Sequence, residues 1–180
     1  MDFLDFENHD LYFDEALTPA QASMLIQAAE AYPDKRTENL LRELYAEKPD
    51  SLQVLVALYR FYYYQHRLED ALDIAAHAIS VSAINLGLTV DWSELCAQHL
   101  FESASAPMAL IRFYMLALKA AAYLLLRLGR VEDAIARLNK IVELDPADQF
   151  GASFLYKIAR KELVNREVAA QANVESLFRR

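Results

Sequence analysis

The side chains best able to do chemistry in this sequence are Cys96 and His99, which stand three residues apart in Cys-Ala-Gln-His. On a helix this spacing places a thiol and an imidazole on one face. A structural zinc site needs about four such ligands, and a nucleophilic cysteine needs a third group to orient its histidine. No second cysteine–histidine pair stands nearby, and Glu7, His9 and Asp10 form only a short polar cluster. The sequence therefore predicts neither a metal site nor an active site.

Composition disfavours several other functions as well. The three glycines, Gly87, Gly129 and Gly151, are scattered along the chain, so no glycine-rich loop can hold a nucleotide phosphate. The formal net charge of −8 disfavours nucleic acid, whose backbone repels an acidic protein. A single cysteine among 180 residues excludes an internal disulfide and fits a reducing compartment. We therefore expect a cytoplasmic protein that is not an enzyme and binds no cofactor and no nucleic acid.

The most membrane-like stretch is 113–128. Arg112 precedes it, and Lys119 and Arg127 interrupt it, so no run approaches the roughly eighteen uncharged apolar residues typical of a span. The first ten residues lack a basic region ahead of an apolar run, so we expect no secretory signal. We expect no membrane association and interpret 113–128 as a helix buried on most of its sides.

Hydrophobic periodicity and capping signals predict helices along most of the chain. Thr18 and Pro19 have the residue types of an N-cap and a first helical position, and Pro49 and Pro146 end helices. No stretch alternates in the manner of a strand. The predicted fold class is all-α, with helices over about 18–32, 35–47, 51–65, 68–83, 91–102, 108–128, 131–144 and 149–178, the last as one helix or two.

Two stretches, 52–85 and 115–148, repeat at a distance of 63 residues. In each, a helix is followed by a short turn and then by Leu-Glu-Asp-Ala71 or Val-Glu-Asp-Ala134. A small residue there lets the second helix of a hairpin lie close to the first, and with the run from Leu124 to Pro146 the pattern resembles the tetratricopeptide repeat (TPR) family. The strings 58–64 and 112–129 are also similar to TPR proteins encoded among bacterial nitrogen-fixation genes.

The TPR resemblance implies one domain over 18–180, built as an array of helical hairpins. Its parts would be a degenerate repeat at 18–51, in which Thr37 takes the small-residue position, repeats at 52–85 and 115–148, and a C-terminal capping helix within 149–178. Residues 86–114 would be an insertion, which either shields a hydrophobic flank or forms a binding lobe specific to the family. Residues 1–17 would be an acidic N-terminal segment that can be flexible.

The resemblance also implies a function, because the first helix of each TPR hairpin lines a concave groove that binds protein. Arginine pairs with carboxylates and tyrosine supplies rigid contact area. The implied partner is therefore a protein or peptide of acidic and aromatic character. Each tyrosine can instead belong to the core, as we expect for Tyr59, Phe61 and Tyr62. Carried over by position, the partner-binding residues are Arg60, Tyr63 and Tyr64 from one repeat, and Lys119, Tyr123 and Arg127 from the other.

Two alternatives to an adaptor or scaffold stay open. One is a self-associating structural TPR protein that forms a homodimer through exposed helix faces. The other is a small dedicated chaperone, similar to the acidic TPR chaperones of bacterial secretion systems. The carboxylate-clamp type of TPR is disfavoured, because Ala120 and Tyr123 flank Lys119 where that type has asparagines.

The N-terminal segment has a composition that complements such a groove. Residues 2–15 contain six acidic residues, no lysine or arginine, and several aromatic residues. We hypothesise that this segment docks in the protein's own groove or in that of a neighbour, and that a partner displaces it. The alternative is a solvated tail or a strap that caps the first helix.

Overall fold

Eight α-helices and no strands make up the part of the chain that the structure, a computed structural model, describes: residues 17–32, 34–102 and 107–178. The predicted all-α fold class is therefore confirmed. The helices are α1 (Pro19–Glu30), α2 (Lys35–Glu47), α3 (Leu52–Tyr64), α4 (Leu68–Asn85), α5 (Ala97–Glu102), α6 (Met108–Arg127), α7 (Val131–Leu144) and α8 (Ala152–Phe178).

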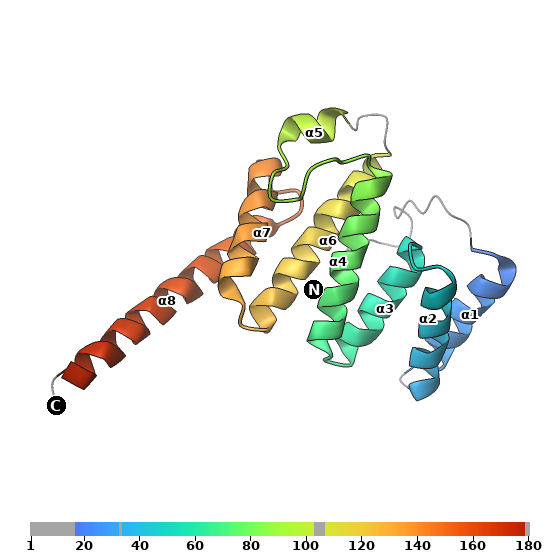
Figure 1. Ribbon diagram of the computed structural model, residues 1–180, viewed down its shortest axis with the longest axis horizontal. Helices are drawn as coiled ribbons and strands as arrows, with labels where there is room; N and C mark the ends of the chain where they lie inside the picture. The colour runs from blue at the N-terminus through green and yellow to red at the C-terminus, as the bar shows by residue number, and fades with distance from the viewer. Residues whose placement is uncertain (1–16, 33, 103–106, 179–180) are drawn as a thin grey trace.

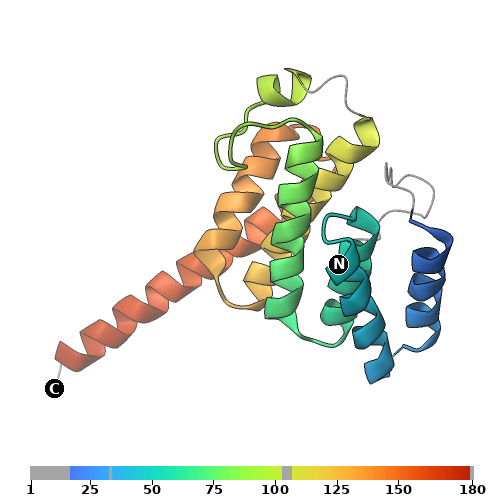
Figure 2. The same ribbon diagram turned by 45° about the vertical axis from the view of Figure 1, so that its right-hand side comes forward.

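Successive helices fold back on one another and stack in chain order (Figure 1). α1 packs on α2, α3 on α4, and α6 on α7, and these three hairpins are joined by contacts of α2 with α3 and of α4 with α6. The α2–α3 interface is the smallest of these. α5 lies across one end of the bundle, while α8 packs on α7 and then projects away, opposite to α1 (Figures 1 and 2).

The helix ends follow the capping signals of the sequence. Thr18 Oγ1 accepts from the Gln21 backbone N–H at 3.3 Å, and Gln21 Oε1 accepts from the Thr18 N–H at 3.1 Å. This capping box precedes Pro19 at the start of α1. The predicted bounds of α2 and α7 are confirmed, whereas α4 continues to Asn85 and α8 is a single helix that begins at Ala152.

The insertion differs from the helix predicted over 91–102. Asp91 Oδ1 accepts hydrogen bonds from the Ser93 backbone N–H at 3.0 Å and from the Ser93 hydroxyl at 2.6 Å. These bonds close a turn rather than start a helix, because an aspartate side chain can bond its own backbone two residues on. α5 begins only at Ala97.

This turn is held against α7. The ring of Trp92 lies 4.7 Å from the guanidinium carbon of Arg137, and Lys140 Nζ donates to the Leu95 carbonyl at 3.0 Å. The Leu95 side chain is fully buried in the common core. This packing favours the shielding role that the sequence suggested for the insertion.

The α3–α4 and α6–α7 hairpins are equivalent in detail. His66 (φ 58°) and Gly129 (φ 78°) both adopt the left-handed conformation in their connecting turns. In each hairpin the residue after this turn position is an arginine that donates a hydrogen bond to an aspartate three residues later. The residue after that aspartate is a fully buried alanine. These residues are Arg67, Asp70 and Ala71 in the first hairpin and Arg130, Asp133 and Ala134 in the second. The helical repeat read from the sequence is therefore present in the structure.

α6 is the central helix of the bundle. It is the one helix, among the described residues, that is long and apolar enough to cross a membrane. Of its most apolar 18 residues, 67% are buried inside the protein. α6 contacts α4 on one side and α7 on the other. Its apolar composition is therefore accounted for by packing, as expected for 113–128.

A polar network fixes α2 against α3 and α4. Arg67 Nη1 donates to Glu38 Oε1 at 2.8 Å, and its guanidinium carbon lies 4.5 Å from the centre of the Tyr62 ring. The Tyr45 hydroxyl also lies 2.8 Å from His77 Nδ1, which joins α2 to α4. Because α1 packs on α2, these contacts hold the whole α1–α2 hairpin against the rest of the bundle.

Candidate binding site

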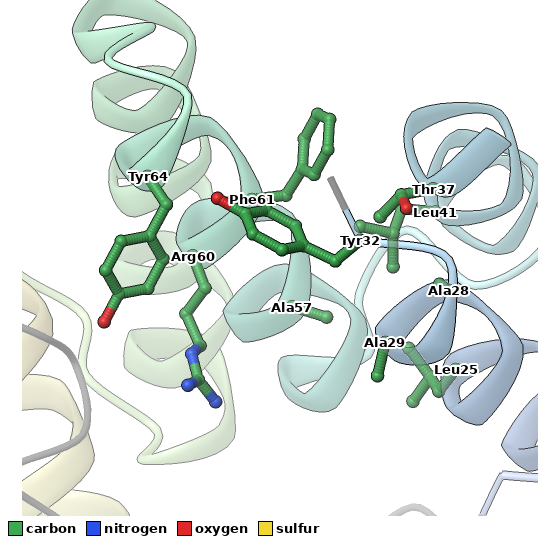
Figure 3. A pocket seen from close by; sticks show the side chains of 10 residues that line it. All are labelled: Leu25, Ala28, Ala29, Tyr32, Thr37, Leu41, Ala57, Arg60, Phe61 and Tyr64. Atoms are coloured by element: carbon green, nitrogen blue, oxygen red, sulfur yellow. The ribbon is translucent and has the colours of Figure 1, made fainter. Parts of the chain in front are cut away.

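A pocket of about 430 Å³ lies between α1 and α3 (Figure 3). Its volume falls within the range of roughly 300–1,000 Å³ that is common for ligand pockets. The pocket is lined by Leu25, Ala28, Ala29 and Tyr32 from α1 and the turn after it, by Thr37 and Leu41 from α2, and by Ala57, Arg60, Phe61 and Tyr64 from α3.

Small side chains open this pocket. Ala28 and Ala29 from α1 lie opposite Ala57 from α3 (Figure 3). Larger residues at these three positions would fill the space between the two helices, as side chains normally do in a close-packed interior. Small side chains on two facing helices, Ala29 and Ala57 above all, therefore leave the space that the pocket occupies.

Two polar groups line an otherwise apolar and aromatic wall. The Arg60 side chain brings a positive charge to the pocket from α3 (Figure 3). Thr37 is 3% exposed, and its Oγ1 has no hydrogen-bond partner among the residues that the structure describes. A buried hydroxyl without a partner costs about 1–3 kcal/mol, but this oxygen is covered by its surroundings and is not presented to an occupant of the pocket. The pocket suits an apolar group that carries or adjoins a negative charge.

Aromatic rings extend the site from the pocket toward α6. Tyr32 meets Phe61 edge to face, with ring centres 6.4 Å apart. Tyr64, 47% exposed, meets Tyr63 at 5.4 Å, and Tyr63 in turn lies 6.3 Å from Tyr123. The pocket wall is therefore continuous with an aromatic cluster that bridges α3 and α6.

Arg127 supplies the positive charge of this second part. Its Nη1 donates to the Tyr123 hydroxyl at 3.3 Å, and this bond holds the pKa of Tyr123 below its usual range. Burial, and then the hydrogen bond with Tyr123, raises the pKa of Tyr63 to about 12. The Tyr63 hydroxyl is therefore neutral at physiological pH. Arg127 supplies the positive charge of the cluster, and Tyr63 adds no negative charge to it.

The two repeats present the same pair of residue types with their order exchanged. Arg60 and Tyr64 of α3 occupy the positions that Tyr123 and Arg127 occupy in α6, 63 residues later. The members of each pair are four residues apart and share a helix face. An extended ligand that crosses from α1 to α6 would meet an arginine–tyrosine pair twice.

Five of the six predicted partner-binding residues lie in this region, and Lys119 does not. Arg60 and Tyr64 line the pocket, and Tyr63, Tyr123 and Arg127 form the adjoining cluster. Tyr59, Phe61 and Tyr62 are buried, as expected for core residues.

The placement of Lys119 in the groove is wrong. Its side chain is 5% exposed, and its ammonium donates to the Phe150 carbonyl in the connection between α7 and α8. The repeat itself carries a signal of this, because Val56 stands at the equivalent position of α3 and is also buried. A lysine there needs an internal acceptor, and the folded connection provides one.

The α1 side of the pocket was missed by sequence reasoning. Leu25 and Tyr32 belong to the degenerate hairpin, for which the family pattern gave no binding positions. Thr37 was assigned to the small-residue position, and the structure shows it buried at the pocket wall. The alanines at 28, 29 and 57 gave only a weak signal, because alanine is common throughout these helices.

The cysteine and histidine singled out in the sequence form no metal site within the described residues. Cys96 Sγ lies 3.3 Å from His99 Nδ1, but no group of three potential metal ligands occurs in the described part of the chain. Glu7, His9, Asp10 and the segment hypothesised to dock, 2–15, lie outside the described residues.

Comparison with known proteins gives one extended match. The chain is 45% identical over 177 residues to a protein of Azotobacter chroococcum mcd 1 described as an uncharacterized 19.8 kDa protein in the nifW 5′ region. The match covers 97% of this chain and 99% of the other. No protein-family model and no solved structure match the chain.

Proposed function

We propose that this chain, which belongs to the same family as the Azotobacter chroococcum protein, is a cytoplasmic TPR-like adaptor without catalytic activity. It binds a segment of another protein along α1, α3 and α6. The segment has acidic residues for Arg60 and Arg127, and an aromatic or aliphatic side chain that enters the pocket.

The observation that carries this proposal is the pocket itself, with its apolar wall, its single arginine and its continuation along Tyr64, Tyr63 and Tyr123. A small molecule would need only the pocket. The wider arrangement, in which an arginine–tyrosine pair recurs on α6, suits a longer and more extended ligand.

The hairpin geometry supports the TPR-like part of the proposal. The buried alanines at 71 and 134 and the left-handed turns at 66 and 129 recur at one spacing. First helices of successive hairpins then lie on a common side of the array, which is how helical repeats build a binding surface. The α3 and α6 residues of the site come from two such helices.

The test is affinity capture from bacterial extract followed by mass spectrometry, with two double variants. Arg60→Glu with Arg127→Glu reverses both charges of the site. Arg112→Glu with Arg160→Glu reverses two exposed charges elsewhere and is the matched control. A true partner is retained by wild type and control and lost by the site variant. Equal capture by all three proteins would refute the proposal.

A second candidate function, self-association, is favoured by α8. Phe154, Ile158, Val164 and Val168 of this helix are 45–70% exposed, and at 100° per residue they fall on one side of it. Sedimentation of the wild type and of a Phe154→Asp, Val168→Asp variant tests this candidate. A dimer mass that the variant lowers to that of a monomer would support it, and a monomeric wild type would exclude it.

A further inference from the structure

The pocket is lined by the helix that directly follows the N-terminal segment. Leu17 packs against the core ahead of α1, and residues 1–16 precede it in the chain. Ala28 and Ala29, in the C-terminal half of α1, line the pocket. A chain that turned back from Leu17 along α1 would therefore arrive at the pocket.

The composition of the segment matches the lining of the pocket. Its sequence contains Asp5-Phe6-Glu7, in which an aromatic side chain stands between two carboxylates. The pocket offers an apolar wall for the ring and Arg60 for a carboxylate. Because residues 2–15 contain no lysine or arginine, nothing in the segment opposes this attraction.

The length of chain between Leu17 and each aromatic residue indicates which of them reaches the pocket most easily. At about 1.5 Å per residue, Ala28 lies about 17 Å along α1 from Leu17. Phe13 is four residues from Leu17 and reaches at most about 14 Å. Phe6 is eleven residues away, and a flexible chain of that length spans about 18 Å on average. Phe6 thus reaches this distance without a stretched chain, whereas Phe13 would need a fully extended chain to reach the near end of the pocket at Leu25.

We propose that Phe6 occupies the α1–α3 pocket of its own chain, with Asp5 and Glu7 beside Arg60, and that a partner segment must displace it. The inference deepens the proposed function, on which the displacement rests, but self-occupancy itself requires no partner. Tethering gives the segment an effective concentration of about millimolar at the pocket. A contact of low intrinsic affinity is therefore enough for the segment to occupy the pocket and to exclude free ligands that are weak or dilute.

Disulfide trapping in the full-length chain tests this contact. In a Cys96→Ser background, Asn8→Cys leaves Phe6 and its carboxylates in place, and Ala29→Cys marks the exposed edge of the pocket. The matched control replaces Ala29→Cys by Gln27→Cys, which is exposed and at a similar height along α1 but on the opposite face of the helix. The measurement is the rate of disulfide formation in a glutathione redox buffer, read by mass spectrometry without reduction.

The expected result is an intramolecular disulfide that forms several-fold faster in the Asn8→Cys, Ala29→Cys variant than in the Asn8→Cys, Gln27→Cys variant. Adding Phe6→Ala should remove the difference. Equal rates for the two variants would overturn the inference. A disulfide-linked dimer would also overturn it, because the segment would then occupy the pocket of a second copy.

Failure here is distinguishable from failure of the proposed function. If the rates are equal but the Arg60→Glu, Arg127→Glu variant still loses its partner, only self-occupancy is wrong. If trapping succeeds and no partner depends on the arginines, the adaptor proposal is wrong and the internal contact stands. With both correct, full-length Phe6→Ala should bind the captured partner more tightly than wild type.

Discussion

The two left-handed turn residues, His66 and Gly129, are predicted to respond in opposite ways when their residue types are exchanged. They occupy equivalent positions in two hairpins, with φ of 58° and 78°. Only glycine adopts this conformation without a steric penalty, since an L-residue there costs about 1–2 kcal/mol. His66 is exposed and has little packing to lose. His66→Gly should therefore stabilise the protein, and Gly129→His should destabilise it.

The magnitude follows from two opposing effects. Relief of the left-handed penalty contributes about 1–2 kcal/mol, and the greater freedom of glycine in the unfolded chain subtracts about 0.5–1 kcal/mol. His66→Gly should thus raise the free energy of unfolding by about 0.5–1 kcal/mol. Gly129→His should lower it by a similar amount, because a Cβ there meets only Arg166 Nη2, at 3.8 Å. The double exchange should be close to neutral.

Urea unfolding followed by circular dichroism measures these changes. With a slope of about 2 kcal/mol per molar urea, the midpoint should move by about 0.3–0.5 M. Gln65→Gly is the matched control, because Gln65 lies in the same turn at φ −81°, where glycine brings only its entropic cost. If His66→Gly and Gln65→Gly both lowered the midpoint, the structural equivalence of the two turns would be refuted.

Three further predictions concern packing, the buried lysine and pH. Ala134→Leu should destabilise the protein by about 1–3 kcal/mol because Ala134 is fully buried between α6 and α7, while Ala136→Leu on the exposed side of α7 should have little effect in the same denaturation assay. Lys119→Met removes the donor to the Phe150 carbonyl and should speed amide exchange at the start of α8 without changing partner capture; loss of capture would return Lys119 to the groove. Since burial raises the pKa of Tyr63 from about 10 to about 12, the unfolded chain releases this proton first, and stability should fall as pH rises through that window. Tyr63→Phe should flatten the fall, and an unchanged pH profile would contradict the raised pKa of Tyr63.

Local signals were sufficient for most of the helices. α2 and α7 begin and end where the sequence predicts, because Asp34 caps α2 and a proline follows shortly after the end of each helix. The insertion did not follow from the same reasoning. Asp91 begins a turn whose position depends on Trp92 and Leu95 packing against α7, and such distant contacts leave no periodic pattern in the sequence.

The candidate site was predictable on one side only. Arg60 and Tyr64 could be placed because α3 belongs to a repeat with a recognisable partner in α6. Lys119 was misplaced because helix periodicity gives a direction but not the path of the α7–α8 connection, which covers that direction. The α1 wall depends on the small side chains of Ala28 and Ala29. Alanines are common throughout these helices, so the sequence does not indicate which of them border a pocket.

The small α2–α3 interface also divides the molecule into two unfolding units, the α1–α2 hairpin and the rest of the bundle. The α1–α2 hairpin contributes one wall of the pocket, and the larger remainder contributes the other. We therefore expect the hairpin to unfold locally at a lower free energy than the rest, once the Arg67–Glu38 and Tyr45–His77 contacts break. An occupant of the pocket bridges the two units, so part of its binding free energy appears as stability of α1 and α2. Ligand affinity and the local unfolding of the first hairpin are in this way thermodynamically linked.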